Sequence, residues 1–208
     1  MTASTRFVLG AAAAAAYALA SYLLMNHAAN SPLALAAVLG PIAGAMLAGL
    51  WLSGRRVLAL VLAAGAAALI TFAIRGEGVS APLLYLAQHA GVHFGLGLWF
   101  ASTLRAHRTP LITVFAKQLH REVTPAVLHY TRQVTVAWVV FFFAMTALSL
   151  LLFFASYAAW TLFANLLTPV AIAAMFVGEY LLRYRLHPEF ERVSLRAAIA
   201  AYRERHPA

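Results

Sequence analysis

The residues with the clearest capacity for chemistry are Gln88, His89 and His93, which share one apolar stretch. Imidazole changes charge near neutral pH and is a common metal ligand, and side chains four residues apart share a face of a helix. The two histidines could therefore relay protons, act as a general base in acyl or prenyl transfer, or bind a metal or haem. The alternative is a neutral histidine bonded to a hydroxyl or carbonyl group. We favour this structural role, because the sequence places no carboxylate close by.

Metal or haem binding needs more ligands than this spacing supplies. A metal site requires one or two further ligands, and two histidines on one helix cannot take opposite axial positions of a haem. The chain has no cysteine, which removes thiolate ligands and thiol catalysis. We therefore assign no metal ligands and no cofactor.

Two more polar positions fall in the last apolar stretch. Pro169 cannot donate a hydrogen bond to the Asn165 carbonyl, so we expect a kink with a polar pocket formed by Asn165 and Thr168. This pocket could bind a ligand, or it could be no more than a bend in the helix. Glu179 precedes Arg183 by four residues, a spacing that favours an ion pair, with proton transfer as the alternative.

Basic residues beside the apolar stretches form a second candidate site, for lipid headgroups or an acidic partner. Each nearby Lys or Arg attracts an anionic headgroup with about 1 kcal/mol. The alternative is that these residues are solvated and reflect only the orientation of the spans in the membrane. The candidate residues are Arg105, Arg108, Lys117, Arg121, Arg132 and Arg183.

The elements that position these residues are helices in a membrane. Of the 208 residues, 63% are hydrophobic and only 10% are charged, which is more apolar surface than one soluble core can bury. A crossing needs about 20 mainly apolar residues. We predict an all-α membrane protein, a bundle of six transmembrane helices within residues 1–182. The six spans are residues 7–25, 32–52, 57–74, 81–104, 134–157 and 160–182.

The distribution of charge predicts the orientation of these spans. Fourteen of the fifteen basic residues fall at the N-terminus, in the second and fourth connections and in the tail. The positive-inside rule then places both termini in the cytoplasm of a bacterial inner membrane, with Arg75 outside. Nucleic-acid binding is not expected despite the net charge of +9, because the basic residues flank spans and form no separate domain.

Two amphipathic helices and one packing face complete the predicted architecture. Residues 110–123 read as an interfacial helix, and residues 183–208 as a basic cytoplasmic tail that forms another amphipathic helix. Gly91 and Gly95 lie roughly opposite the histidines on the fourth span, where we expect close helix packing. The oligomeric state is left open.

The sequence also excludes classes of enzyme. The chain has no aspartate, which removes an Asp-completed Ser-His triad and Asp-based metal motifs. Motifs for zinc hydrolases, P-loop NTPases and dinucleotide enzymes are missing as well. No catalytic residue is assigned, and we lean towards a protein that is not an enzyme.

One part of the chain resembles a known group of proteins. Tyr130-Thr131-Arg132, Thr135, Trp138, Phe141-Phe142, Trp160, Phe163-Ala164-Asn165, Glu179-Tyr180 and Arg183 resemble a family of uncharacterised bacterial inner-membrane proteins. The resemblance covers residues 125–186. Members of that family tend to be encoded beside genes for fatty-acid-like and aryl-polyene (xanthomonadin-type) pigment synthesis, among acyl carrier proteins and exporters. The resemblance implies a lipid-like product made on the cytoplasmic face.

These observations lead to one main expectation and two alternatives. The main one is an accessory or carrier protein for an acyl-chain or aryl-polyene lipid, in which basic residues attract headgroups or an acidic acyl carrier protein. Five phenylalanines could form its apolar wall, although core packing or lipid contact explains each singly: Phe141, Phe142, Phe143, Phe153 and Phe154. The alternatives are a small proton-linked transporter that uses His89 and His93, and a His-ligated haem or metal protein.

Overall fold

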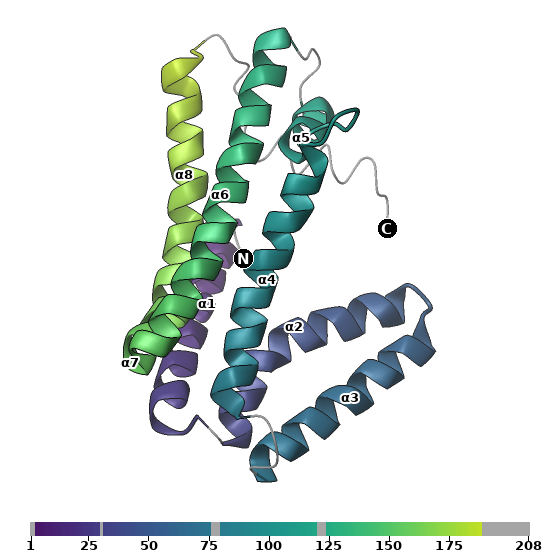
Figure 1. The fold of residues 1–208 in the computed structure, drawn as a ribbon, viewed down its shortest axis with the longest axis vertical. Helices are drawn as coiled ribbons and strands as arrows, with labels where there is room; N and C mark the ends of the chain where they lie inside the picture. Colours follow the sequence, from purple (N-terminus) through teal and green to yellow (C-terminus); the bar gives the residue numbers. More distant parts are fainter. Residues whose placement is uncertain (1–2, 30, 76–79, 120–123, 189–208) are drawn as a thin grey trace. The chain divides into compact units, whose positions relative to one another are not determined.

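The computed structural model describes residues 3–29, 31–75, 80–119 and 124–188. Every regular element within these ranges is a helix (Figure 1). The helices are α1 (Ala3–His27), α2 (Pro32–Leu52), α3 (Arg56–Arg75), α4 (Ala81–Thr103), α5 (Leu111–Leu119), α6 (Pro125–Ala155), α7 (Tyr157–Leu162), the π-helical turn η1 (Phe163–Leu167) and α8 (Thr168–Leu186).

All six stretches predicted as spans are largely helical, although the fifth, residues 134–157, includes the break at Ser156 between α6 and α7. Within the described ranges, three helical segments are long and apolar enough to cross a membrane: Val8–His27, Pro125–Ala155 and Tyr157–Leu186. Two shorter apolar helices are Leu39–Leu52 and Arg56–Ala68. These helices are those of a membrane protein.

The chain divides into two compact units. The first unit contains residues up to Gly91 together with Ala147–Val170, and the second contains Val92–Thr146 together with the chain from Ala171 onward. Helices α4, α6 and α8 each contribute to both units. The interior of each unit is described below by itself.

Helices α2 and α3 form an antiparallel hairpin in the first unit (Figure 1). The Gly54 N–H donates to the Trp51 carbonyl (3.1 Å) and the Arg55 N–H donates to the Leu50 carbonyl (2.9 Å). Gly54 adopts a φ of +77°, a conformation that glycine reaches without strain. This is the Schellman arrangement, which ends α2 and fixes where α3 begins.

Elsewhere in the first unit, hydrogen bonds join α1 to the region of α7. The Tyr157 hydroxyl donates to the Met25 carbonyl (3.0 Å), and Asn26 Nδ2 donates to Thr161 Oγ1 (2.8 Å). Ser156 caps α7 by accepting from the Ala159 N–H. Hydrogen bonds therefore connect these helices, alongside the buried side chains of Met25 and Trp160.

Aromatic rings fill the second unit. Trp138 of α6 lies with its ring centroid 5.4 Å from Phe142 and 4.8 Å from Phe176 of α8. Phe100 of α4 packs edge-on against Phe142 at 5.3 Å, and α6 and α8 lie side by side (Figure 1). Edge-to-face aromatic pairs contribute about 0.5–1.5 kcal/mol beyond the area they bury. This cluster is the core of the second unit.

The described residues of this chain do not show the close packing predicted at Gly91 and Gly95. A Cβ atom added at either glycine meets no described atom of another element within 4 Å. The close approach is instead at Gly97, where a Cβ would lie 3.1 Å from the Phe143 ring. At Gly97 the close neighbour is the aromatic side chain of Phe143, whereas the small-residue pattern predicted close approach of another helix backbone.

The two predicted amphipathic helices are described only in part. Helix α5 covers Leu111–Leu119 of the predicted interfacial segment, and α6 begins at Pro125. The rest of that segment, residues 120–123, lies outside the described residues, as does most of the tail, residues 189–208.

Candidate functional site

His89 is the centre of a buried polar cluster in the first unit. Its side chain is 8% exposed, with Nδ1 lying 3.0 Å from Ser149 Oγ of α6 and Nε2 lying 3.0 Å from Thr168 Oγ1 of α8. Two neighbouring helices thus supply hydroxyl partners to both ring nitrogens. These contacts are the hydroxyl bonds expected of a structural histidine, and the role of His89 stays a prediction.

The chemistry of the partners fixes the direction of these hydrogen bonds. The Trp160 indole N–H can only donate, and it donates to Ser149 Oγ (3.0 Å). At the other end, Thr168 Oγ1 donates to the Phe163 carbonyl (2.9 Å), which can only accept. Because the single Thr168 hydroxyl proton goes to the Phe163 carbonyl, the ring donates from Nε2 to Thr168. In the neutral ring, Nδ1 then accepts from the Ser149 hydroxyl.

A π-helical turn positions the Thr168 hydroxyl. The turn covers Phe163–Leu167, and the Thr168 backbone N–H donates to the carbonyl of Phe163, five residues earlier. The same carbonyl accepts from the Thr168 hydroxyl. We expected a kink at Pro169 that frees the Asn165 carbonyl. The structure has a π turn before Pro169, a feature frequent at functional sites.

Asn165 belongs to the same unit but bonds to a different residue of α4. The Tyr85 hydroxyl donates to Asn165 Oδ1 (3.0 Å), and Asn165 Nδ2 donates to the Thr161 carbonyl (2.8 Å). Tyr85 lies one turn before His89, and the two rings meet edge-on at 6.4 Å. The expected polar pocket at Asn165 and Thr168 is therefore occupied by Tyr85 and His89.

The other polar candidates of α4 have separate surroundings. Gln88 is partly buried in the first unit. His93 belongs to the second unit, where it is 6% exposed and lies 6.2 Å from the Phe142 ring. Among the residues that the structure describes, no three His, Asp or Glu side chains form a group that could hold a metal ion.

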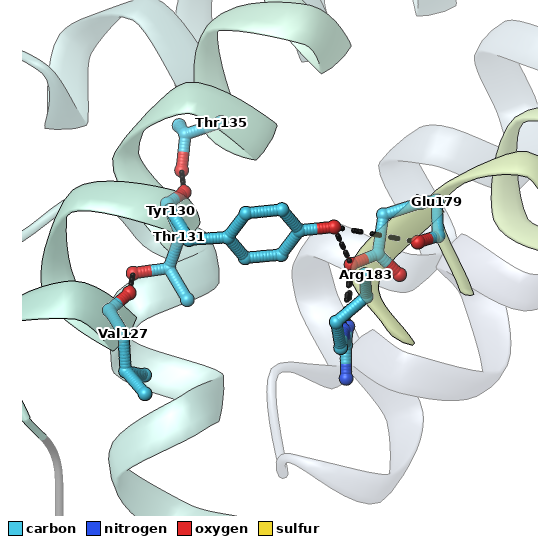
Figure 2. Close-up of polar contacts among 6 residues, drawn as sticks. All are labelled: Val127, Tyr130, Thr131, Thr135, Glu179 and Arg183. Carbon is cyan, nitrogen blue, oxygen red and sulfur yellow. Dashed lines mark hydrogen bonds and ion pairs between the residues drawn. The ribbon is translucent and has the colours of Figure 1, made fainter. Parts of the chain in front are cut away.

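Glu179 lies in the second unit, where it forms the expected ion pair. Arg183 Nη2 and Nε lie 2.6 and 2.8 Å from Glu179 Oε1, and Figure 2 shows Tyr130 reaching from α6 to this carboxylate, with its hydroxyl 3.2 Å from Oε1. The ring of Tyr130 also packs against His187. The i, i+4 ion pair is confirmed, and Arg183 has its charge offset by Glu179.

The remaining basic candidates lie on or near the connection between α4 and α6. The exposed ones are Arg105, Arg108, Lys117 and Arg132. A turn holds the first two close together, because the Arg108 N–H donates to the Arg105 carbonyl (3.2 Å) and His107 adopts a φ of 64°. Arg121 lies outside the described residues.

Hydroxyl groups attach α5 to its neighbours in the second unit. Thr113 Oγ1 lies 2.7 Å from Thr131 Oγ1 of α6, and the Leu111 N–H donates to Thr103 Oγ1 of α4 (3.1 Å). Because Thr113 faces inward, Val114 and Phe115 remain 36% and 48% exposed. Helix α5 therefore presents apolar side chains and Lys117 to its surroundings.

The five candidate phenylalanines are divided between the two units. Phe142 is part of the aromatic core, and Phe143 packs against Phe94. In the first unit, Phe153 packs edge-on against Trp160 at 4.9 Å, whereas Phe154 is 77% exposed. Packing within the protein accounts for the positions of most of these rings. This is the alternative to an apolar wall that binds a ligand.

Three residues of these clusters were not identified as site residues from the sequence. Ser149 and Trp160 bond to each other beside His89, and Tyr130 binds Glu179. Ser149 carried a usable signal, since it is a hydroxyl residue inside a nearly continuous apolar run. The positions of Trp160 and Tyr130 depend on tertiary contacts that spacing does not reveal.

Comparisons with protein-family models, with curated proteins and with solved structures found no match for this chain.

Proposed function

We propose that the chain is a six-span bacterial inner-membrane protein, with both termini cytoplasmic, that acts as an accessory or carrier protein for an acyl-chain or aryl-polyene lipid. In this role it binds membrane lipid and docks an acidic biosynthetic partner, such as an acyl carrier protein, on its basic cytoplasmic face. The family resemblance of residues 125–186 supplies the biosynthetic context.

The observation that carries the proposal is the surface formed by α5 and the turn before it. Arg105 and Arg108 are exposed in the turn, and Lys117 is exposed on α5 itself. Val114 and Phe115 are exposed on the same helix. Exposed cations attract an acidic partner and accelerate its association. Exposed apolar side chains suit the membrane interface or the chain of a lipid-like product. We call these five residues the α5 surface.

The polar cluster around His89 argues for this reading over a proton-linked transporter. Both ring nitrogens of His89 lie against hydroxyls, and these hydroxyls also bond to the Trp160 indole and to the Phe163 carbonyl, neither of which relays a proton. The buried hydroxyls of Ser149 and Thr168 thus support packing of helices rather than transport.

A binding experiment tests the role of the α5 surface. The full-length protein in lipid nanodiscs is titrated with a purified acidic acyl carrier protein, and the triple variant Arg105→Glu, Arg108→Glu, Lys117→Glu is compared with wild type. We expect the variant to bind at least tenfold more weakly, and wild-type binding to weaken as salt is raised, because exposed charges are screened within about 10 Å at 0.1 M salt.

The matched control is Arg75→Glu, which reverses a cation predicted to lie on the opposite side of the membrane. This control should bind like wild type. Unchanged binding and unchanged product formation in the triple variant would overturn the docking role. Mass analysis of the protein purified from its native membrane should in parallel find a retained acyl or polyene lipid, and a protein without one would contradict the carrier role.

A further inference from the structure

An open apolar groove runs along the α2–α3 hairpin of the first unit. It has a volume of about 430 Å³, within the roughly 300–1,000 Å³ range of small-molecule pockets. Small side chains on α3, with Ala59 buried against α2, leave this space between the helices. The lining residues are Leu47, Ala48, Trp51, Leu52, Ala59, Leu60 and Ala63.

Two arginines, Arg55 and Arg56, lie at one end of this groove. Arg55 and Arg56 directly follow the Schellman turn that ends α2, and both are exposed. The Arg56 guanidinium lies 5.5 Å from the centre of the Trp51 ring, which lines the groove. A cation–π contact of this kind holds a guanidinium in place with about 0.5–1 kcal/mol at an exposed site.

No acidic residue occurs in the hairpin sequence from Pro32 to Arg75. The Arg55 and Arg56 charges therefore have no carboxylate partner within the hairpin. An occupant of the groove must be apolar along its length, and an anionic group at the basic end would complement the two guanidinium groups. Arginine is well suited to this role, because its planar fork bonds phosphate oxygens in pairs.

The dimensions of the groove favour a slender occupant. Its wall on α2 runs from Leu47 to Leu52, which is about 8 Å at the helical rise of 1.5 Å per residue. A helix is about 10–12 Å wide with its side chains, whereas an acyl chain is only a few ångströms across. Part of one acyl chain therefore enters a groove between two neighbouring helices more readily than a helix from a second copy does.

We infer that the α2–α3 hairpin is a binding site for one anionic glycerophospholipid. One acyl chain lies in the groove against Ala48 and Ala63, and the phosphate is held by Arg55 and Arg56 beside Trp51. Tryptophan is enriched at this level of a membrane, where its ring spans apolar and polar surroundings. The site is separate from the α5 surface and requires only that the hairpin is embedded in a membrane.

Native mass spectrometry of the full-length protein tests the headgroup contact. The protein is released from nanodiscs that contain equal amounts of phosphatidylglycerol and phosphatidylcholine, and retained lipids are counted. Wild type should retain one phosphatidylglycerol in preference to phosphatidylcholine. Each arginine contributes about fivefold to that preference, so Arg55→Gln with Arg56→Gln should lower it roughly thirtyfold. Arg55→Lys with Arg56→Lys should keep most of it.

The control for the headgroup contact is Arg75→Gln with Arg185→Gln, which removes the same charge from two exposed positions that belong neither to the basic end of the groove nor to the α5 surface. This variant should retain the lipid like wild type. An unchanged preference in the Arg55, Arg56 double Gln variant would overturn the site. Failure of this test leaves the carrier-protein titration unaffected, so the two proposals fail separately.

A second pair of variants tests the acyl-chain contact. Ala48→Phe fills the groove, whereas Ala45→Phe places the same ring on an exposed position of α2 that does not line it. We expect Ala48→Phe to lose the retained lipid and Ala45→Phe to keep it. Equal retention by these two variants would show that the groove is not the site.

Discussion

The two units of this chain use different chemistry to hold their helices together. In the first unit, His89 joins α4 to α6 and α8 through two hydroxyls, and Asn165 adds a second connection through Tyr85. In the second unit, aromatic rings around Trp138 do most of this work, with the Glu179–Arg183 ion pair at the margin.

The difference teaches how helices can associate in a lipid environment. Lipid tails are as apolar as leucine, so helix association depends on packing and on interhelical hydrogen bonds. Neutral hydrogen bonds there contribute about 0.6 kcal/mol on average and up to about 1.7 kcal/mol each. Large packed rings contribute more per residue. We therefore expect the loss of a core ring of the second unit to cost more than the loss of the His89 imidazole of the first unit.

The largest expected effect is that of Trp138→Ala. Trp138 is 5% exposed and contacts Phe141, Phe142 and Phe176, so its removal leaves a large cavity. We expect the free energy of unfolding to fall by about 3 kcal/mol, measured by loss of helical circular dichroism during titration with SDS. Trp99→Ala is the matched control, because Trp99 is 53% exposed, and it should cost much less. Equal losses of unfolding free energy in Trp138→Ala and Trp99→Ala would show that the aromatic core does not stabilise the second unit.

His89→Leu should have the next largest effect. It leaves the Ser149 and Thr168 hydroxyls without their shared partner, at a cost of about 2 kcal/mol, measured by the same titration. His129→Leu controls for the loss of an imidazole, because His129 is exposed, and it should change stability little. A loss larger than that of Trp138→Ala would reverse the order of the two units.

Part of this arrangement could be predicted from the sequence, because some of its signals are local. Apolar length identified the helices, and the spacing of Glu179 and Arg183 predicted their ion pair, which is confirmed. Each of these features depends on residues within one element. Whether all six helices cross the membrane stays a prediction.

The remainder depended on contacts between distant segments. The partners of His89 lie 60 and 79 residues away in the sequence, and Tyr130 lies 49 residues from Glu179. Helical spacing singled out His89, and the proline at position 169 singled out Thr168, but neither signal could pair the two residues. These signals also could not foresee that the turn before Pro169 would be π-helical, because that geometry follows from how Thr168 bonds to Phe163 and His89.

The smallest expected effect comes from two glycines on α4 in the second unit, and it tests whether ring packing or small-residue packing governs that unit. Alanine is favoured over glycine by about 1 kcal/mol in a helix interior. Gly95→Ala should realise much of this gain, because its Cβ meets no described atom of another element within 4 Å. In Gly97→Ala the new Cβ would lie 3.1 Å from the Phe143 ring, so the ring must shift and the gain should be largely offset. Thermal unfolding in detergent should thus rank Gly95→Ala above Gly97→Ala. If Gly95→Ala instead destabilises the protein, the small-residue face of α4 is packed against another chain, and aromatic packing alone does not describe the second unit.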